Sequence, residues 1–435
     1  MYLMIQNSGV ADVRSFTKLG LSSARGQSDK IGQFGSGAKH GVLTLMRHGL
    51  NPAIYCGRTK LEFFSQPAKM GGTSYGDMFV RIDKSKAQEL SFCLEFGSLD
   101  WTDVAMGLRE LVSNAIDNDD KNSVEIAIVE KPRAKDGFTR VFVPVTPDVQ
   151  QFVNTLPDRF LQFSGREKKT ILEKEREGRA RIYRKGVFIR ELSSKGDSLF
   201  DYNFGDELTI DECRNSSDWD CQSAIASAVS KDRNAVNTIF SHIVAGKTHF
   251  AEFKLSQYSL ECQSWWLEIW ENIAGKNAVI ITETSRIMVQ FIVKAGFKPY
   301  VVTDEWHYAM KRAKIRDGIT CLDGAASKGC ETVDVPVKSQ AMFDQTWQWL
   351  AELKMTGGKN KPKLSVFAKV ADQSETTLCG YYENGCVYIN VDNATNRMTY
   401  LEEFAHYVTN ATDCSRAFQE YFIQATSRML SLIFE

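Results

Sequence analysis

The sequence lacks any apolar run of the roughly 18 residues that a helix needs to span a bilayer. It also lacks an excess of charge, because 53 Lys and Arg face 54 Asp and Glu, for a formal net charge of −1. The first absence argues against a membrane partner, and the second gives no indication of a nucleic-acid partner. The opening residues, MYLMIQNSGV, have no basic leader before an apolar stretch, so we expect a cytoplasmic location.

Paired cysteines are absent as well, since the ten Cys residues stand singly and none forms a C-x-x-C pair. This pattern is typical of reduced, structural thiols and argues against a cysteine-only zinc site. The 435 residues are 43% apolar and 25% charged, as in ordinary folded proteins, and their number predicts about two to four domains. Strand-like and helix-like patterns alternate, so we expect an α/β (α+β) multidomain fold divided into residues 1–160, 161–215, 216–335 and 336–435.

The strongest local patterns lie in the first of these ranges. Residues 53–96 contain several strand-like runs with turn signals at Gly57-Arg58 and Gly71-Gly72, which predicts several strands. Residues 101–118 have apolar positions at helical spacing, with Asp100 or Thr102 expected to cap the helix. Later in the chain, residues 276–315 have the pattern of a small β-α-β unit.

A glycine-rich segment, IGQFGSGAKHG at residues 31–41, precedes a predicted helix. Glycines allow backbone N–H groups to approach an anion closely, and the helix N-terminus adds favourable partial charge. Lys39 can supply a point charge to phosphate. The segment is not a P-loop, because Ala38 stands where that motif needs Lys, and its glycine spacing does not fit a dinucleotide fingerprint.

Three polar residues of the 101–118 helix share one helical face, because Glu110, Asn114 and Asp117 lie at positions i, i+4 and i+7. A Glu can position a water for attack, and an Asn four residues later can hold Mg²⁺ through its amide oxygen. The alternative is an ordinary polar helix face directed to solvent.

Together, the two segments resemble the glycine box and the Asn box of the GHKL ATPases, which include gyrase, the ninety-kilodalton heat-shock chaperones, histidine kinases and MutL. Ile5–Val10 resembles the family's D-x-G-x-G strand, and Leu19–Ser23 resembles the L-G-T-S that follows it. In the family the Asn helix comes first, whereas here it comes last. The first 160 residues therefore resemble a circularly permuted GHKL sandwich, a mixed sheet covered by helices on one face.

The resemblance implies Mg²⁺-dependent ATP binding and slow ATP hydrolysis that drives a conformational change in the C-terminal domains. Glu110 would be the catalytic base and Asn114 the Mg²⁺ ligand. An unidentified protein partner and a homodimer are further partners that this reading allows. The residues assigned to the nucleotide are Asn7, Gly9, Gly32, Gly35, Ser36, Gly37, Ala38, Lys39, Asn114 and Asp117.

The chain departs from the family at two positions that matter for the base. Asn7 stands where the family has the Asp that accepts a hydrogen bond from the adenine amino group, and Ala11 replaces the second glycine of D-x-G-x-G. An Asn oxygen also accepts a hydrogen bond, but without a charge.

Relatives with a transducer domain direct a Lys to the γ-phosphate. Lys185, in the added strands of residues 161–215, is the candidate for this role. The alternative is that Lys185 is an ordinary charged residue on the solvent face of a strand.

The C-terminal range contains Glu402-Glu-x-x-His406, which resembles the H-E-x-x-H helix of zinc metallopeptidases. Glu402 and His406 occupy the two ligand positions and Glu403 the position of the base. Asp413 or Glu420 is the candidate third ligand, so Zn²⁺ is a second cofactor to test.

Three interpretations of this helix stay open: a peptidase-like domain without activity, a working or regulatory zinc site, and a coincidence on a polar helix. The second makes the protein a zinc metallopeptidase, either ATP-regulated or independent. A non-catalytic binding protein that uses both sites as scaffolds is a further alternative for the whole chain.

Overall fold

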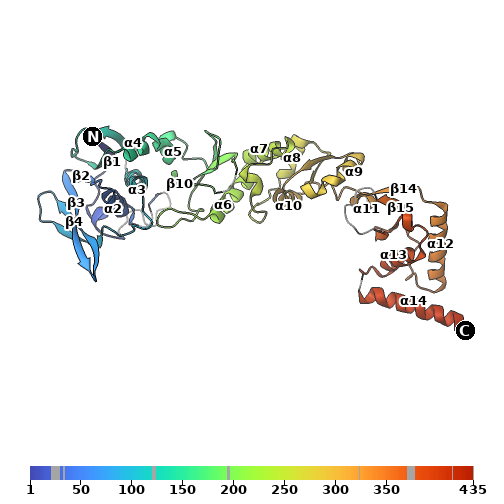
Figure 1. Cartoon of the computed structure of the whole chain (residues 1–435). Helices are drawn as coiled ribbons and strands as arrows, with labels where there is room; N and C mark the ends of the chain where they lie inside the picture. Colours follow the sequence, from blue (N-terminus) through green and yellow to red (C-terminus); the bar gives the residue numbers. More distant parts are fainter. Residues whose placement is uncertain are drawn as a thin grey trace. The chain divides into compact units, whose positions relative to one another are not determined.

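The computed structural model describes residues 1–20, 30–32, 35–119, 124–193, 196–322, 324–369, 378–413 and 415–434. Contacts divide the chain into two compact units, Met1–Val229 with His249–Ser259 and Ser230–Thr248 with Leu260–Glu435 (Figure 1). Both units combine helices and sheets, which confirms the α/β multidomain class. Over the described residues, no helix is both long enough and apolar enough to cross a membrane.

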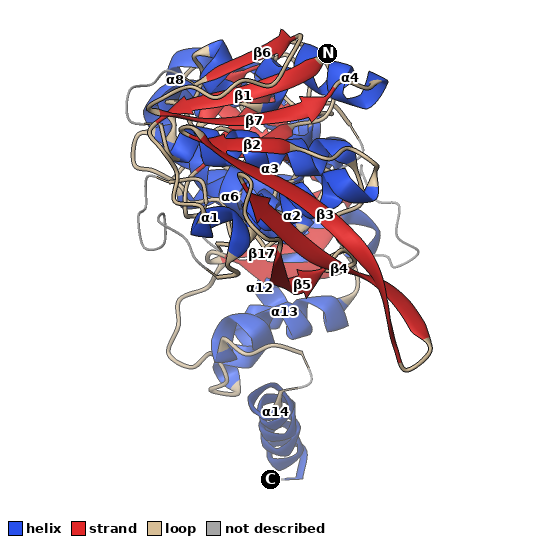
Figure 2. Cartoon of the chain, turned by 90° about the vertical axis from the view of Figure 1, so that its left-hand side faces the viewer, coloured by secondary structure: helices blue, strands red, loops and turns tan. Residues whose placement is uncertain are grey.

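A seven-stranded sheet, in the order β5-β4-β3-β2-β7-β1-β6, forms the framework of the first unit (Figure 2). All its strand pairs are antiparallel, so the expectation of a mixed sheet is wrong. The predicted strands are confirmed, and each glycine turn joins a hairpin. Although β1 and β6 are separated by more than a hundred residues, they pair along the sheet edge. The strands are β1 (Tyr2–Ser8), β2 (Ala53–Cys56), β3 (Thr59–Met70), β4 (Thr73–Ile82), β5 (Gln88–Cys93), β6 (Glu125–Val129) and β7 (Phe138–Pro144).

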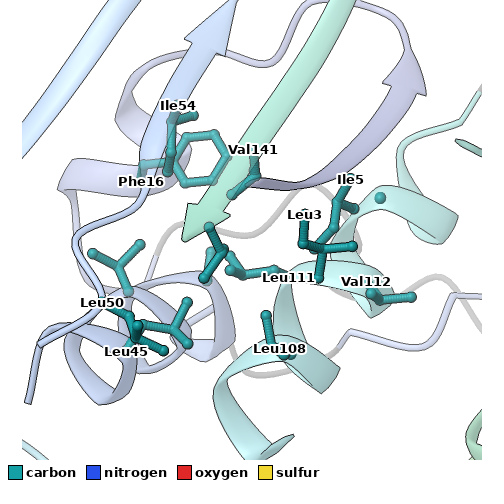
Figure 3. Close-up of a cluster of buried hydrophobic side chains, with 14 of the residues drawn as sticks. Leu3, Ile5, Phe16, Leu45, Leu50, Ile54, Leu108, Leu111, Val112 and Val141 are labelled. Atoms are coloured by element: carbon teal, nitrogen blue, oxygen red, sulfur yellow. The ribbon is translucent and has the colours of Figure 1, made fainter. Parts of the chain in front are cut away.

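Helices α2 (Gly37–Arg47) and α3 (Val104–Asp117) pack on each other and on one face of this sheet. Alternation along β1 directs Leu3 and Ile5 to the helices, where they join the buried core drawn in Figure 3. A Cβ on Gly41 would lie 2.9 Å from the Gly107 carbonyl oxygen, so glycine permits the close approach of α2 and α3.

The helix predicted at residues 101–118 is confirmed, but the prediction of its cap is wrong. Asp103, rather than Asp100 or Thr102, is the N-cap of α3, and its carboxylate accepts a hydrogen bond from the Met106 N–H at 2.8 Å. Asp103 has extended backbone angles and lies three residues before Met106, the geometry that satisfies a free N–H of the first helical turn.

A second, four-stranded sheet of the first unit has the order β10-β9-β11-β8. The 249–259 segment is joined to it by the buried Glu252 carboxylate, which accepts hydrogen bonds from Ser198 Oγ and Tyr202 Oη at 2.5 and 2.7 Å. The strands are β8 (Ile171–Glu173), β9 (Arg181–Arg184), β10 (Val187–Glu191) and β11 (Phe200–Phe204); the remaining helices are α1 (Arg14–Thr17), α4 (Pro147–Asn154), α5 (Leu156–Arg159), η1 (Leu161–Ser164) and η2 (Ala251–Lys254), and α6 (Asp218–Lys231) ends beyond the boundary of the unit.

The second unit begins with helices around a buried aromatic cluster, in which Trp266 and Trp306 stack at 5.5 Å and Phe240 packs edge-on. The predicted β-α-β unit is confirmed, because β12 and β13 are parallel and α9 lies between them in the chain. The elements are α7 (Arg233–Val244), α8 (Trp266–Ala274), β12 (Ala278–Ile281), η3 (Glu283–Met288), α9 (Val289–Lys294), β13 (Lys298–Val301), α10 (Asp304–Arg312) and α11 (Gly324–Ser327).

The last part of the second unit is a four-stranded sheet in the order β14-β15-β17-β16, packed against helices. Helix α13 carries the Glu-Glu-x-x-His sequence and contacts β16 and β17. The elements are β14 (Cys330–Val333), α12 (Val337–Glu352), β15 (Lys363–Lys369), β16 (Gly380–Glu383), β17 (Cys386–Asn390), η4 (Val391–Asn393), α13 (Arg397–Thr409) and α14 (Arg416–Phe434).

Candidate functional site

A cavity of about 270 Å³ lies in the first unit, between the glycine segment, α3 and the strands β1 and β7. It is lined by nearly all residues that the sequence assigned to a nucleotide, brought together from three separate parts of the chain. Gly9 is not among its lining residues; the Gly9 N–H donates to the Gly137 carbonyl at 2.9 Å. The assigned residues that line the cavity are Asn7, Gly32, Gly35, Ser36, Gly37, Ala38, Lys39, Glu110, Asn114 and Asp117.

Part of the sequence motif cannot be located. Gln33, Phe34 and residues 21–23 of the L-G-T-S-like segment lie outside the described residues. The polar face of α3 can be located, and it does not face solvent. Glu110 and Asp117 are 4% and 7% exposed and Asn114 is half-buried, so the interpretation of a solvent-directed helix face is wrong.

Asp117 fixes the start of the glycine segment. Its two carboxylate oxygens accept hydrogen bonds from the backbone N–H groups of Ile31 and Gly32, at 2.7 and 2.6 Å. Burial raises the pKa of Asp117, and these two backbone donors oppose the increase. Asp117 therefore positions backbone N–H groups at the cavity wall through direct contacts with the loop.

Glu110 lies beneath the end of the glycine segment. A Cβ on Gly37 would come within 2.5 Å of Glu110 Oε2, so this position accepts only glycine without a rearrangement. The glycine pattern thus has two physical purposes here: it leaves backbone accessible to a ligand and it makes room for the carboxylate.

The Glu110 carboxylate forms a two-pronged ion pair with a residue that the sequence did not single out. Arg214 Nε and Nη2 lie 2.6 and 3.0 Å from Oε1 and Oε2 of Glu110, and Arg109 Nε lies 3.3 Å from Oε1. Burial by itself would raise the pKa of Glu110, but the charge and hydrogen bonds of Arg214, followed by those of Arg109, lower it. Glu110 is therefore a buried, ionised carboxylate.

Lys185 does not take the place expected for a cation at the cavity. It pairs with Asp206 at 2.7 Å and donates to the Lys30 carbonyl at 3.0 Å, and it is not a lining residue. Arg214 and Glu212, from the turn after β11, line the cavity instead. No local motif marks either residue, because their role depends on a contact more than a hundred residues away along the chain.

Two Asn side chains are oriented by their amide nitrogens. Asn114 Nδ2 donates to the Glu110 carbonyl at 2.8 Å, and Asn7 Nδ2 donates to the carbonyls of Ser8 and Asn118 at 2.7 and 3.1 Å. Each amide oxygen is then the group available as an acceptor or ligand. Oxygen ligands are those that Mg²⁺ prefers, so Asn114 Oδ1 beside the glycine segment fits a Mg²⁺ ion.

Lys39 is the buried cation of the glycine segment. It is 2% exposed, its Nζ donates to the Gly35 carbonyl at 2.7 Å, and burial lowers its pKa to about 8. A positive charge in such a place is favoured when an anion enters, because the anion offsets the cost of burial.

The Glu-Glu-x-x-His helix of the second unit has a different arrangement. Glu402 is exposed, whereas Glu403 is 5% exposed and burial raises its pKa to about 7. His406 Nδ1 lies 2.8 Å from the Ala411 carbonyl, and Nε2 lies 2.9 Å from Asp413 Oδ1. Glu420 pairs with Arg416 instead.

The proposed zinc ligands do not form a preassembled set. Within the part of the chain that the structure describes, no three His, Cys, Asp or Glu side chains converge as metal ligands. His406 and Asp413 are in contact, but Zn²⁺ binding by His406 Nε2 requires that this ion pair open.

Comparisons with known proteins add no family assignment: no protein-family model matches the chain, and no curated protein matches it in sequence.

Proposed function

We propose that the first unit binds ATP with Mg²⁺ in the 270 Å³ cavity and hydrolyses it slowly, and that binding drives a conformational change in the rest of the chain. The observation that carries the proposal is the convergence of the glycine segment, the polar face of α3 and β1 on one cavity. A small preference of ATP for one conformation is sufficient for such coupling, since about 1.4 kcal/mol changes a population ratio tenfold.

The sheet order supports the resemblance to a permuted GHKL sandwich. β1 pairs with β6, the strand that follows the Asn-box helix in the chain, and this is the neighbour expected if the two were once consecutive. Helices α2 and α3 cover the face of the sheet on which β1 contributes Ile5 and Asn7 to the cavity.

The orientation of Asn7 supports a base with an exocyclic amino group. Its amide oxygen is an acceptor, so it matches the 6-amino group of adenine and opposes the 6-oxo group of guanine, which is itself an acceptor. A mismatched base would leave buried polar groups without partners, which is the physical source of selectivity. Adenine is therefore the favoured base.

The phosphates would be bound by the glycine segment, the N-terminus of α2 and Lys39. Mg²⁺ would be held by Asn114 Oδ1 and would neutralise phosphate charge there. Glu110, one helical turn before Asn114, would accept a proton from the attacking water once its carboxylate leaves Arg214.

The placement of Mg²⁺ is tested with Asn114→Ala. Calorimetry with a non-hydrolysable ATP analogue should show Mg²⁺-dependent affinity for the wild type and none for the variant, because the metal loses its amide ligand. Asn154→Ala, at an exposed position of α4 outside the cavity lining, is the matched control and should retain Mg²⁺ dependence. Unchanged Mg²⁺ dependence in Asn114→Ala would refute this placement of the metal.

The role of Glu110 is tested with Glu110→Gln, which keeps the shape of the side chain and removes its basicity. ATP binding should be retained, while hydrolysis should fall by about 10²-fold or more, the usual contribution of a general base. Equal turnover rates in the wild type and the variant would show that Glu110 is not the base.

A further inference from the structure

A short turn after β11 places a carboxylate at the end of the cavity where phosphate is expected. The turn, residues 211–215, is held by its own hydrogen bonds: the Asp211 N–H donates to the Asn215 carbonyl at 2.9 Å, and Asp211 Oδ1 accepts from the Asn215 N–H at 2.7 Å. Arg214 has a φ of 63°, which directs the middle of the turn sharply back. The turn therefore presents Glu212 and Arg214 as one small rigid piece.

Glu212 contacts the first turn of α2. Its Oε1 accepts a hydrogen bond from the hydroxyl of Ser36, the N-cap of α2, and lies 3.7 Å from His40 Nε2. The His40 ring is fixed between Phe96 and Trp101, with ring centroids 4.8 Å away on each side. A negative charge at a helix N-terminus is electrostatically favourable, so this is a position built for an anion.

Arg214, from the same turn, forms an ion pair with the Glu110 carboxylate. The turn is also held by Arg109 Nη2, which donates to the Cys213 carbonyl at 2.9 Å. Glu212, Arg214, Ser36 and Glu110 all line the same cavity. One turn thus occupies the anion position with Glu212 and neutralises Glu110 with Arg214.

We propose that Glu212 is a built-in competitor of the nucleotide phosphates, and that nucleotide binding displaces the 211–215 turn and thereby releases Glu110 from Arg214. This inference rests on the proposed nucleotide site. A phosphate and a carboxylate repel each other at the N-terminus of α2, so they cannot both be held there. Because Glu212 and Arg214 belong to one rigid turn, displacement of the first moves the second.

The test compares Glu212→Gln with the wild type by calorimetry, using the full chain, Mg²⁺ and the β,γ-imido analogue of ATP. Removing the competing charge should raise the affinity for the analogue about tenfold, as expected for the loss of one like charge. Adenosine, which has no phosphate, should bind both chains equally. Glu177→Gln, which removes the same charge elsewhere in the first unit, is the matched control and should behave as the wild type.

Hydrogen exchange provides the second measurement. Binding of the analogue to the wild type should accelerate exchange of the Arg214 and Asn215 amides, which donate within and across the turn in the unliganded protein. Unchanged exchange with the analogue bound would show that the turn remains in place and would overturn the coupled release of Glu110.

The two proposals fail in different ways. Analogue binding to the wild type with equal or weaker affinity in Glu212→Gln overturns the role of Glu212 and leaves the nucleotide site intact. Analogue binding to Glu212→Gln but not to the wild type would support the proposal that Glu212 competes with the nucleotide phosphates. Absence of binding to both chains overturns both proposals, and the failure then lies with the nucleotide site itself.

Discussion

Glu110 and Glu403 are the same residue type at similar burial, on helices of similar length in different units, yet their pKa values shift in opposite directions. They are 4% and 5% exposed. The pKa of Glu110 is lowered because Arg214 and Arg109 outweigh the effect of burial. The pKa of Glu403 is raised to about 7 because the effect of burial outweighs the opposing electrostatic effect of His406.

The difference teaches that burial by itself does not assign a chemical role to a carboxylate. A buried carboxylate paired with guanidinium stays charged, while a buried carboxylate without such a partner holds its proton to near neutrality. Here the deciding group for Glu110 arrives from a turn 104 residues later in the chain. The helix motifs in the sequence identify both glutamates as candidate site residues, but they do not predict the charge state of either one.

The largest expected effect comes from removing Arg214, the cation of the Arg214–Glu110 ion pair. Arg214→Gln leaves Glu110 buried with only Arg109 beside it, and we expect a loss of about 3–5 kcal/mol in the free energy of unfolding of the first unit. Denaturant unfolding followed by circular dichroism measures it. Glu110→Gln in the same chain should recover most of the loss, because the unpaired charge is then gone.

Arg58→Gln is the matched control for this comparison. Arg58 pairs with Asp136 at the surface, with side chains that are 82% and 62% exposed, and its removal should leave the unfolding midpoint unchanged. A loss in Arg214→Gln no larger than in this control would contradict a strong pair at Glu110.

The second effect concerns the pH dependence of Glu403. Its pKa rises from 4.5 to about 7 on folding, so the stability that the neutral acid provides is complete below pH 4.5 and is lost as the pH rises through 7. The full difference is about 3 kcal/mol at 1.36 kcal/mol per pKa unit. Glu403→Gln should therefore raise the melting temperature of the second unit at pH 8 and leave it unchanged at pH 4.5.

Glu402→Gln, at the exposed neighbouring position, is the control and should show no such gain. The same variants decide between the interpretations of the helix. If Glu403→Gln is less stable at pH 8, and the wild type holds stoichiometric zinc by plasma emission and cleaves unfolded substrates, the metallopeptidase interpretation gains and the inactive-domain interpretation falls.

The smallest expected effect is on nucleotide affinity, and it extends the comparison of the buried glutamates to a buried cation, Lys39. The pKa of Lys39 is lowered to about 8 by burial, and a bound phosphate would restore the charged form. Affinity for the ATP analogue should then fall about tenfold from pH 7 to pH 9, because Lys39 of the unliganded protein loses its proton over this range. Lys39→Arg, whose guanidinium stays charged, should show a flat profile in the same calorimetric titration. A tenfold fall in that variant would assign the titration to another group.

Much of the local structure was determined by the sequence itself. The spacing of Glu110, Asn114 and Asp117 predicted a shared helical face, and the strand-like runs between turn signals predicted the strands of residues 53–96. The alternating and helical patterns predicted strands and helices that the structure confirms, including the β-α-β unit of the second unit. These features depend on residues a few positions apart, and the periodicity of helix and strand is a local property of the backbone.

The tertiary structure alone decided which groups meet. It placed Asp103 rather than its neighbours at the helix cap. It also placed Arg214 rather than Lys185 at the cavity wall and brought Glu212 into contact with Ser36. It also gave the two buried glutamates opposite pKa shifts. Such contacts join segments far apart in the chain, and their energies depend on distance and burial, which no spacing within a single segment contains.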